Sequence, residues 1–132
     1  MIVDTVVLVH TLLARTPEAD LCATALRRAE SISAPELVLS EALSAVWQWA
    51  RAGRISRATA RSILADVPEV LQTIIPVREL WIDALDLAIE RDHTPYDTLF
   101  VALAAREDDR VITLDRRMLA KFPEWTVRPG DV

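Results

Sequence analysis

Ile2-Val3-Asp4 opens the chain, and Val111-Ile112-Thr113-Leu114-Asp115 has a similar pattern near the other end. Each segment is a short apolar run that closes on an aspartate. Both runs predict buried strands, and in an open parallel sheet the ligand lies beyond the carboxyl ends of the strands. Asp4 and Asp115 are therefore expected at one edge of a sheet, where a functional site belongs.

Strand and helix signals alternate between these two segments. Strands separated by helices predict a mostly parallel central sheet with helices on both faces, which is a three-layer α/β sandwich. The expected strands are 2–4, 31–34, 70–77, 111–114 and 125–127. The expected helices are 6–14 (whose apolar run also fits a strand), 18–30, 35–52 closed by Gly53, 56–68 capped by Ser56, 78–91, 94–106 capped by Thr94, and 115–122.

Composition limits the class of protein. With 132 residues, 52% of them hydrophobic, the chain suits one domain (residues 1–132) with a sizeable core. The single cysteine excludes an internal disulfide, and neither a signal peptide nor a membrane span is apparent, so we expect a cytoplasmic protein. The net charge of −5 argues against a general electrostatic hold on nucleic acid. Arginine supplies all but one of the 15 basic residues, so the net charge does not exclude a local rim of arginines that binds phosphate.

Four carboxylates stand at the edges of apolar runs: Asp4, Glu41, Asp97 and Asp115. Burying acids beside apolar surface is costly unless cations or hydrogen bonds compensate. If the fold gathers the four, like charges about 4 Å apart repel by about 4 kcal/mol per pair at an effective dielectric constant of about 20. A divalent cation relieves that repulsion, and carboxylate oxygens suit Mg²⁺ or Mn²⁺ and hence phosphate chemistry.

Each acid also has a structural explanation. Asp4 and Asp115 are both placed to cap the helix that follows them, and Asp97 completes a capping box with Thr94. Glu41 projects from a largely apolar helix face, although a glutamate at the boundary of such a face can also reach water. These roles and metal binding are compatible, since a helix N-terminus orients an acid.

Other candidate residues are expected to be structural. His10 and His93 have no partner at the spacing of metal ligands, and His93 is the better placed to border a site. Trp47, Trp49 and Trp81 lie at helical spacing with aliphatic residues, which favours packing in the core or at an interface over base stacking. The chain contains only two glycines and therefore no Gly-rich phosphate loop.

With these acids placed, the chain resembles PIN domains, and more closely the toxin ribonucleases of the VapC type, over essentially its whole length. Four motifs in order carry the resemblance: Ile2-Val3-Asp4-Thr5, Ala34-Pro35-Glu36-Leu37-Val38-Leu39-Ser40-Glu41, Tyr96-Asp97 followed by Leu99 and Ala102, and Thr113-Leu114-Asp115-Arg116-Arg117. One position departs from the pattern, because Val6 stands where the family often has a small polar residue.

The resemblance implies a flavodoxin-like sandwich and a metal-dependent endoribonuclease toxin that hydrolyses RNA with Mg²⁺ or Mn²⁺. It places the catalytic and metal-binding cluster on the four acids and a supporting hydroxyl at Thr113. It also implies a homodimer and a small antitoxin protein that occupies the acidic site. Thr5 and Arg116 adjoin the acids in sequence, and we expect them to support the acids or to position substrate phosphates.

Two alternatives to the toxin stay open at this point. One is a PIN nuclease of housekeeping RNA processing that has no antitoxin. The other is a catalytically silent binding module on the same fold, against which the presence of all four acids argues.

Overall fold

Five short strands form one sheet in the computed structural model, which describes residues 1–132. Every neighbouring pair of strands runs parallel, and the strand order is β3-β2-β1-β4-β5. The strands are β1 (Ile2–Val3), β2 (Ser33–Pro35), β3 (Thr73–Ile75), β4 (Val111–Ile112) and β5 (Thr126–Val127). The expected central sheet is confirmed, and it is wholly parallel.

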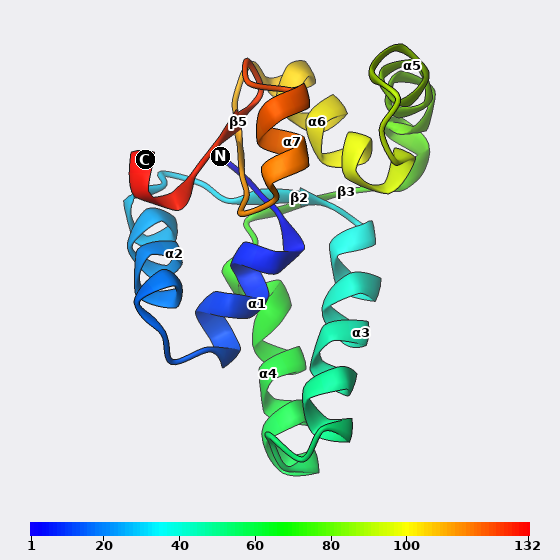
Figure 1. Cartoon of the computed structure of the whole chain (residues 1–132). Helices are drawn as coiled ribbons and strands as arrows, with labels where there is room; N and C mark the ends of the chain where they lie inside the picture. The colour runs from blue at the N-terminus through cyan, green and yellow to red at the C-terminus, as the bar shows by residue number, and fades with distance from the viewer.

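Helices cover both faces of this sheet. They are α1 (Thr5–Leu13), α2 (Pro17–Arg28), α3 (Leu37–Arg51), α4 (Arg57–Val70), α5 (Trp81–Arg91), α6 (Pro95–Glu107) and α7 (Arg116–Lys121), with short 3₁₀ turns η1 (Val77–Glu79) and η2 (Pro129–Asp131). The handedness of parallel connections sorts them into two layers. The chain advances from β1 to β3 through α1–α4 on one face and returns through α5–α7 on the other (Figure 1). The predicted three-layer sandwich is therefore confirmed.

Helix α6 is the central helix of its layer. All seven residues from Thr98 to Ala104 are buried, because α6 packs against β1, β2 and β4. A helix that is apolar on every side needs such a position. Since α6 leads back to the start of β4, its N-terminus lies over the carboxyl edge of the sheet. Asp97, in its first turn, is carried to that edge.

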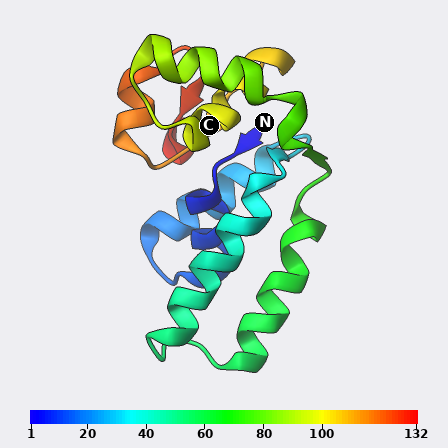
Figure 2. The same ribbon diagram turned by 90° about the vertical axis from the view of Figure 1, so that its right-hand side faces the viewer.

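Helices α3 and α4 form an antiparallel hairpin that extends well beyond the sheet (Figure 2). Gly53 turns the chain between them with a φ of 74°, a conformation that glycine adopts without strain. Ser56 caps α4 as predicted, its hydroxyl accepting a 3.1 Å hydrogen bond from the backbone N–H of Thr59. The hairpin leaves Leu43 and Trp47 of α3 more than half exposed.

Three predicted boundaries are wrong around prolines and long apolar runs. Pro35 belongs to β2 and not to the following helix; it is tolerated there because β1 pairs with β2 only at Ser33, so no ladder bond is lost on that side. Helix α4 continues past Pro68 to Val70, since a proline in the last turn forfeits a single helix bond. The strand expected over 70–77 shrinks accordingly to Thr73–Ile75.

The strand order places a topological switch point between β1 and β4. These two strands are neighbours, and the chain leaves them toward opposite edges of the sheet, which is the arrangement that opens a ligand site in α/β folds. Val3 pairs with Ile112, so Asp4 and Thr113 follow at the same level. No helix in the structure combines the length and the apolar character needed to cross a bilayer.

Candidate active site

A buried hydroxyl links the two segments that were predicted to meet at the sheet edge. Thr113 Oγ1 donates a 2.6 Å hydrogen bond to Asp4 Oδ2, and both side chains are buried. The same oxygen accepts a 3.0 Å hydrogen bond from the backbone N–H of Asp115. Val6, by contrast, is 44% exposed. The hydroxyl that contacts Asp4 therefore comes from Thr113, which follows the neighbouring strand β4, and not from position 6.

Glu41 is held by a second hydroxyl. Thr5, the first residue of α1, donates a 2.8 Å hydrogen bond from Oγ1 to Glu41 Oε1 on α3. The carboxylate is part-buried, as expected for a glutamate on an apolar helix face. Thr5 follows Asp4 directly, so its hydrogen bond ties Glu41 on α3 to the segment that carries Asp4.

Asp97 has a partner that the sequence interpretation missed. Its Oδ2 lies 2.8 Å from His93 Nε2, four residues earlier, and the His93 side chain is only 2% exposed. The expected capping box is absent, because the Thr94 side chain makes no capping hydrogen bond. Asp92 ends α5 in a left-handed conformation (φ 49°) and turns the chain so that His93 faces Asp97. The i, i+4 spacing of His93 and Asp97 was the available signal.

His93 is fixed by packing on its other side. Its ring meets the Phe122 ring edge-on with centroids 5.5 Å apart, and its Nδ1 atom is buried without a hydrogen-bond partner. A ring held in this way has little rotational freedom. His93 therefore constrains where the Asp97 carboxylate can point.

Asp115 caps α7, so the structural explanation of this residue is confirmed. Its Oδ1 accepts hydrogen bonds from the backbone N–H groups of Arg117 at 2.6 Å and Met118 at 3.0 Å. Its Oδ2 makes no hydrogen bond within the protein. Capping therefore leaves one carboxylate oxygen available to a ligand.

Burial raises the pKa of three of the four acids. The pKa of Asp4 rises to about 6, chiefly because the group is buried; the Thr113 hydrogen bond opposes the rise, and the charges of Asp97 and Glu41 add to it. Burial also raises the pKa of Glu41, with the charge of Asp97 adding to the effect against the Thr5 hydrogen bond. The pKa of Asp97 is raised by burial and by the charge of Asp115, and the contact with His93 opposes the rise. The four acids thus share one electrostatic neighbourhood.

The carboxylate oxygens of the four acids are the type of ligand atom that a hard divalent cation binds. No group of three or more His, Cys, Asp or Glu side chains is gathered closely enough to hold a metal ion by itself. The ligand atoms on offer are carboxylate oxygens, which suit Mg²⁺ and Mn²⁺, and their mutual repulsion is what a cation relieves. Metal binding would therefore require the carboxylates to move closer together.

The remaining predicted residues lie outside this cluster. Arg116 points into a neighbouring pocket and makes no hydrogen bond to the acids, whereas Arg117 is the arginine whose charge lowers the pKa of Asp97. His10 Nδ1 donates a 3.0 Å hydrogen bond to the Val6 carbonyl on α1, and its Nε2 lies 3.8 Å from Glu18 Oε2. Trp47 and Trp81 are each 55% exposed, so they are not core residues, and the alternative expectation of packing at an interface stays a prediction for them. The expectation of core packing holds for Trp49, which packs against the core.

The burial of Asp4 predicts how the metal-free protein responds to pH. Its folded pKa of about 6 exceeds the ordinary value of 3.8, so its stabilising contribution is fully present below about pH 4 and is lost as pH rises through 6. The loss is about 3 kcal/mol in the free energy of unfolding. Asp4→Asn removes this dependence. Urea unfolding in EDTA from pH 4 to pH 7 measures it, and parallel profiles for wild type and variant would contradict the prediction.

The chain is similar to known proteins in sequence and in fold. Residues 1–124 match the sequence profile described as the PIN domain, which is nearly the whole chain. The chain belongs to the PIN-domain family. It is 30% identical over 101 residues to Ribonuclease VapC3 of Pyrobaculum aerophilum, covering 75% of this chain and 77% of that protein.

Two solved structures have the same fold. The crystal structure of PAE2754 from Pyrobaculum aerophilum matches this PIN domain with a TM-score of 0.68 and 27% identity, over 91% of this chain and 82% of that one. A chain of a toxin–antitoxin complex from Klebsiella pneumoniae matches with a TM-score of 0.69 over 99% of this chain and 98% of that one. Because the two sequences are only 19% identical, this match shows a shared fold alone.

Proposed function

We propose that this PIN domain is a metal-dependent endoribonuclease toxin, which hydrolyses RNA phosphodiester bonds and is neutralised by an antitoxin. The observation that carries the proposal is the convergence of Asp4, Glu41 and Asp97, each with a raised pKa, at the carboxyl edge of the sheet beside β1 and β4. Acids whose pKa values are perturbed by burial and by one another are characteristic of functional sites. The similarity to a protein named Ribonuclease VapC3 supports RNA as the substrate.

The acids have separate roles in this proposal. Asp4, Glu41 and Asp97 would hold the cation, and Asp115 would contribute through its free oxygen. A bound Mg²⁺ or Mn²⁺ supplies Lewis-acid polarisation of the phosphodiester and a water acidic enough to attack at neutral pH. Thr113 and Thr5 hold Asp4 and Glu41 in place by their hydrogen bonds. No side chain of this chain needs to act as the nucleophile.

Purified protein incubated with total RNA tests the proposal. Cleavage should require added Mn²⁺ or Mg²⁺, stop in EDTA, and generate discrete ends when the products are mapped. Cleavage that is equally fast in EDTA would exclude the metal-dependent mechanism. The absence of cleavage under all conditions would exclude the ribonuclease.

His93 is expected to act as a positioning residue for Asp97. Replacing it with alanine removes the 2.8 Å contact to Asp97 Oδ2 and should lower the cleavage rate by about 10–100-fold, the usual cost of losing a partner of a metal ligand. The Mn²⁺ concentration for half-maximal rate should rise as well. His93→Gln retains an N–H donor and should recover part of the activity. Unchanged Mn²⁺ dependence in His93→Ala would remove His93 from this role.

An antitoxin that silences the site is expected to place an arginine among the acids. Without metal the carboxylates repel one another, and a guanidinium offers positive charge with five fixed donors, enough to satisfy two of them. The segment that delivers it needs an apolar groove. The α3–α4 hairpin carries one of about 420 Å³, lined in part by Leu43, Trp47 and Leu64.

Co-expression with the product of the neighbouring gene tests this partner. The complex should form tightly and cleave RNA far more slowly than the free protein, and replacing the inserted arginine should restore cleavage. A complex that cleaves at the free enzyme's rate would contradict the prediction. Failure to bind any product of the flanking genes would favour a PIN nuclease of RNA processing.

A second copy of this chain is the other partner we propose. Helix α5 exposes an apolar face whose members are all more than half exposed: Trp81, Ile82, Leu85 and Ile89. Large apolar patches of this kind mark interfaces in soluble proteins. Light scattering of the purified protein measures the expected dimer.

A further inference from the structure

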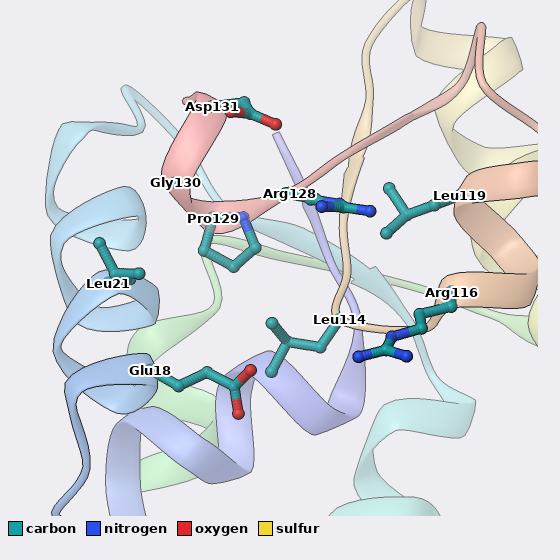
Figure 3. A pocket seen from close by; sticks show the side chains of 9 residues that line it. All are labelled: Glu18, Leu21, Leu114, Arg116, Leu119, Arg128, Pro129, Gly130 and Asp131. Carbon is teal, nitrogen blue, oxygen red and sulfur yellow. The ribbon is translucent and has the colours of Figure 1, made fainter.

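A cavity lies beside the acidic cluster and outside it. It measures about 550 Å³, within the range of about 300–1,000 Å³ that small-ligand sites occupy. Glu18 and Leu21 on α2 form one wall, Arg116 on α7 forms the opposite wall, and the C-terminal segment from Arg128 closes it (Figure 3). Leu114 lies between the two walls.

Strand register places this pocket next to the acids. Val3 pairs with Ile112, and Ile112 pairs with Val127 on β5. The residues that follow, Asp4, Thr113 and Arg128, therefore occupy equivalent positions at the carboxyl ends of three adjacent strands. Two strand spacings, about 10 Å, separate the first from the last. The pocket therefore lies at the same carboxyl edge of the sheet as the acids.

Both arginines of the pocket are without protein partners. Neither the Arg116 nor the Arg128 side chain takes part in any of the ion pairs or hydrogen bonds of the structure, although Glu18 and Asp131 also line the cavity. Figure 3 shows both guanidinium groups on the α7 side of the cavity. Two unpaired guanidinium groups in a concave site bind phosphate oxygens well.

The other walls suit the rest of a nucleotide. Leu21, Leu114 and Pro129 offer aliphatic surface for a base or a ribose. The carboxylates of Glu18 and Asp131 can accept hydrogen bonds, and ribose hydroxyls and base amino groups donate them. Cation, acceptor and apolar surface therefore meet in one cavity at the edge of the proposed cleavage site.

We propose that this pocket binds a nucleotide of the RNA strand next to the cleaved bond, with Arg116 and Arg128 on its phosphate. The inference rests on the proposed ribonuclease function and adds a subsite to it. The strand would cross from the acidic cluster to the pocket over Leu114 and Asp115. Residues of the pocket would then influence which sequences are cleaved.

A pair of RNA substrates tests the subsite. One is a single-stranded oligonucleotide with one mapped cleavage site; the other is the same RNA shortened from either end until the flanking nucleotides are gone. The variants are Arg128→Gln and Leu21→Glu, which places a negative charge in the pocket at a residue that is 52% exposed. Arg27→Gln is the matched control, because Arg27 is an exposed arginine at the far end of α2 that contacts only Thr24.

On the long RNA, Arg128→Gln should lower kcat/KM by about tenfold, the value of a charge-assisted hydrogen bond. The salt dependence of binding should become shallower by about 0.7 in log–log slope, one phosphate contact on a single strand. Leu21→Glu should also lose activity, and Arg27→Gln should match wild type. On the shortened RNA, wild type and Arg128→Gln should be cleaved at the same rate.

Two results would overturn the subsite. One is cleavage of the long RNA by Arg128→Gln and Leu21→Glu at the wild-type rate, the result expected if the pocket serves a protein partner. The other is an equal loss on both RNAs. If wild type cleaves no RNA, the ribonuclease proposal fails by itself, and fluorescence anisotropy with a long and a short single-stranded RNA then decides whether the pocket binds a nucleotide. Binding of the long RNA that depends on Arg128 upholds the subsite, and binding that does not removes it.

Discussion

We expect Asp97→Asn to lose RNA cleavage by more than about 100-fold while the protein stays folded. Asp4→Asn and Glu41→Gln are expected to do the same. Each change keeps the shape of the side chain and removes the charge that a cation needs. The loss should therefore exceed the 10–100-fold that is usual when a hydrogen-bond partner of a metal ligand is removed. Asp115→Asn should lose only part of the activity. One carboxylate oxygen of Asp115 is engaged in capping α7, so only the other can contribute to the cation site.

Stability separates a lost ligand from a lost fold in these variants. At neutral pH the metal-free Asp4→Asn protein should be at least as stable as wild type, since it no longer buries a carboxylate whose pKa is about 6. Asp66→Asn is the matched control, an exposed aspartate on α4. Cleavage rates and melting curves of the same preparations check both points. A folded Asp4→Asn or Asp97→Asn protein with full activity removes that residue from the site.

Divalent metal is expected to raise the melting temperature of the wild type by about 10 °C. A ligand that binds only the folded form at about 100 times its Kd adds about 2.7 kcal/mol, which for a chain of this size corresponds to that shift. The effect should be larger here than for an ordinary surface ion, because bound cation relieves the repulsion among Asp4, Glu41 and Asp97.

The Asp4→Asn, Asp97→Asn double variant is the control for this shift. It keeps Glu41 and Asp115 but lacks Asp4, which follows β1, and Asp97, which lies on α6, so Mn²⁺ should leave its melting temperature nearly unchanged. Lowering the pH to 5 should also reduce the wild-type shift, because protons compete with metal for carboxylates of raised pKa. Equal shifts in wild type and double variant would mean that the acids do not form the metal site.

Strong local signals made most of the fold predictable. Short apolar runs that end in an acid identified β1 and β4, and the alternation of strands with helices predicted a parallel sheet with two helical layers. Two of the boundaries that failed lie at Pro35 and Pro68, where a proline predicted a helix start and a helix end. The third is 70–77, where the apolar run is longer than the strand it contains. Periodicity cannot say where pairing stops in such a run, since pairing depends on the length of the neighbouring strand.

The sequence by itself determined which side chains carry charge at the edges of the core, in which order, and which sheet edge they reach. Only the tertiary structure decided how those side chains are held. Thr113 meets Asp4 across 109 positions of the chain, and Thr5 meets Glu41 across 36, because register and helix packing bring them together. His93 turns toward Asp97 because Asp92 adopts a left-handed conformation and Phe122 packs against the ring. Such contacts depend on distances between elements, which residue patterns along one element do not encode.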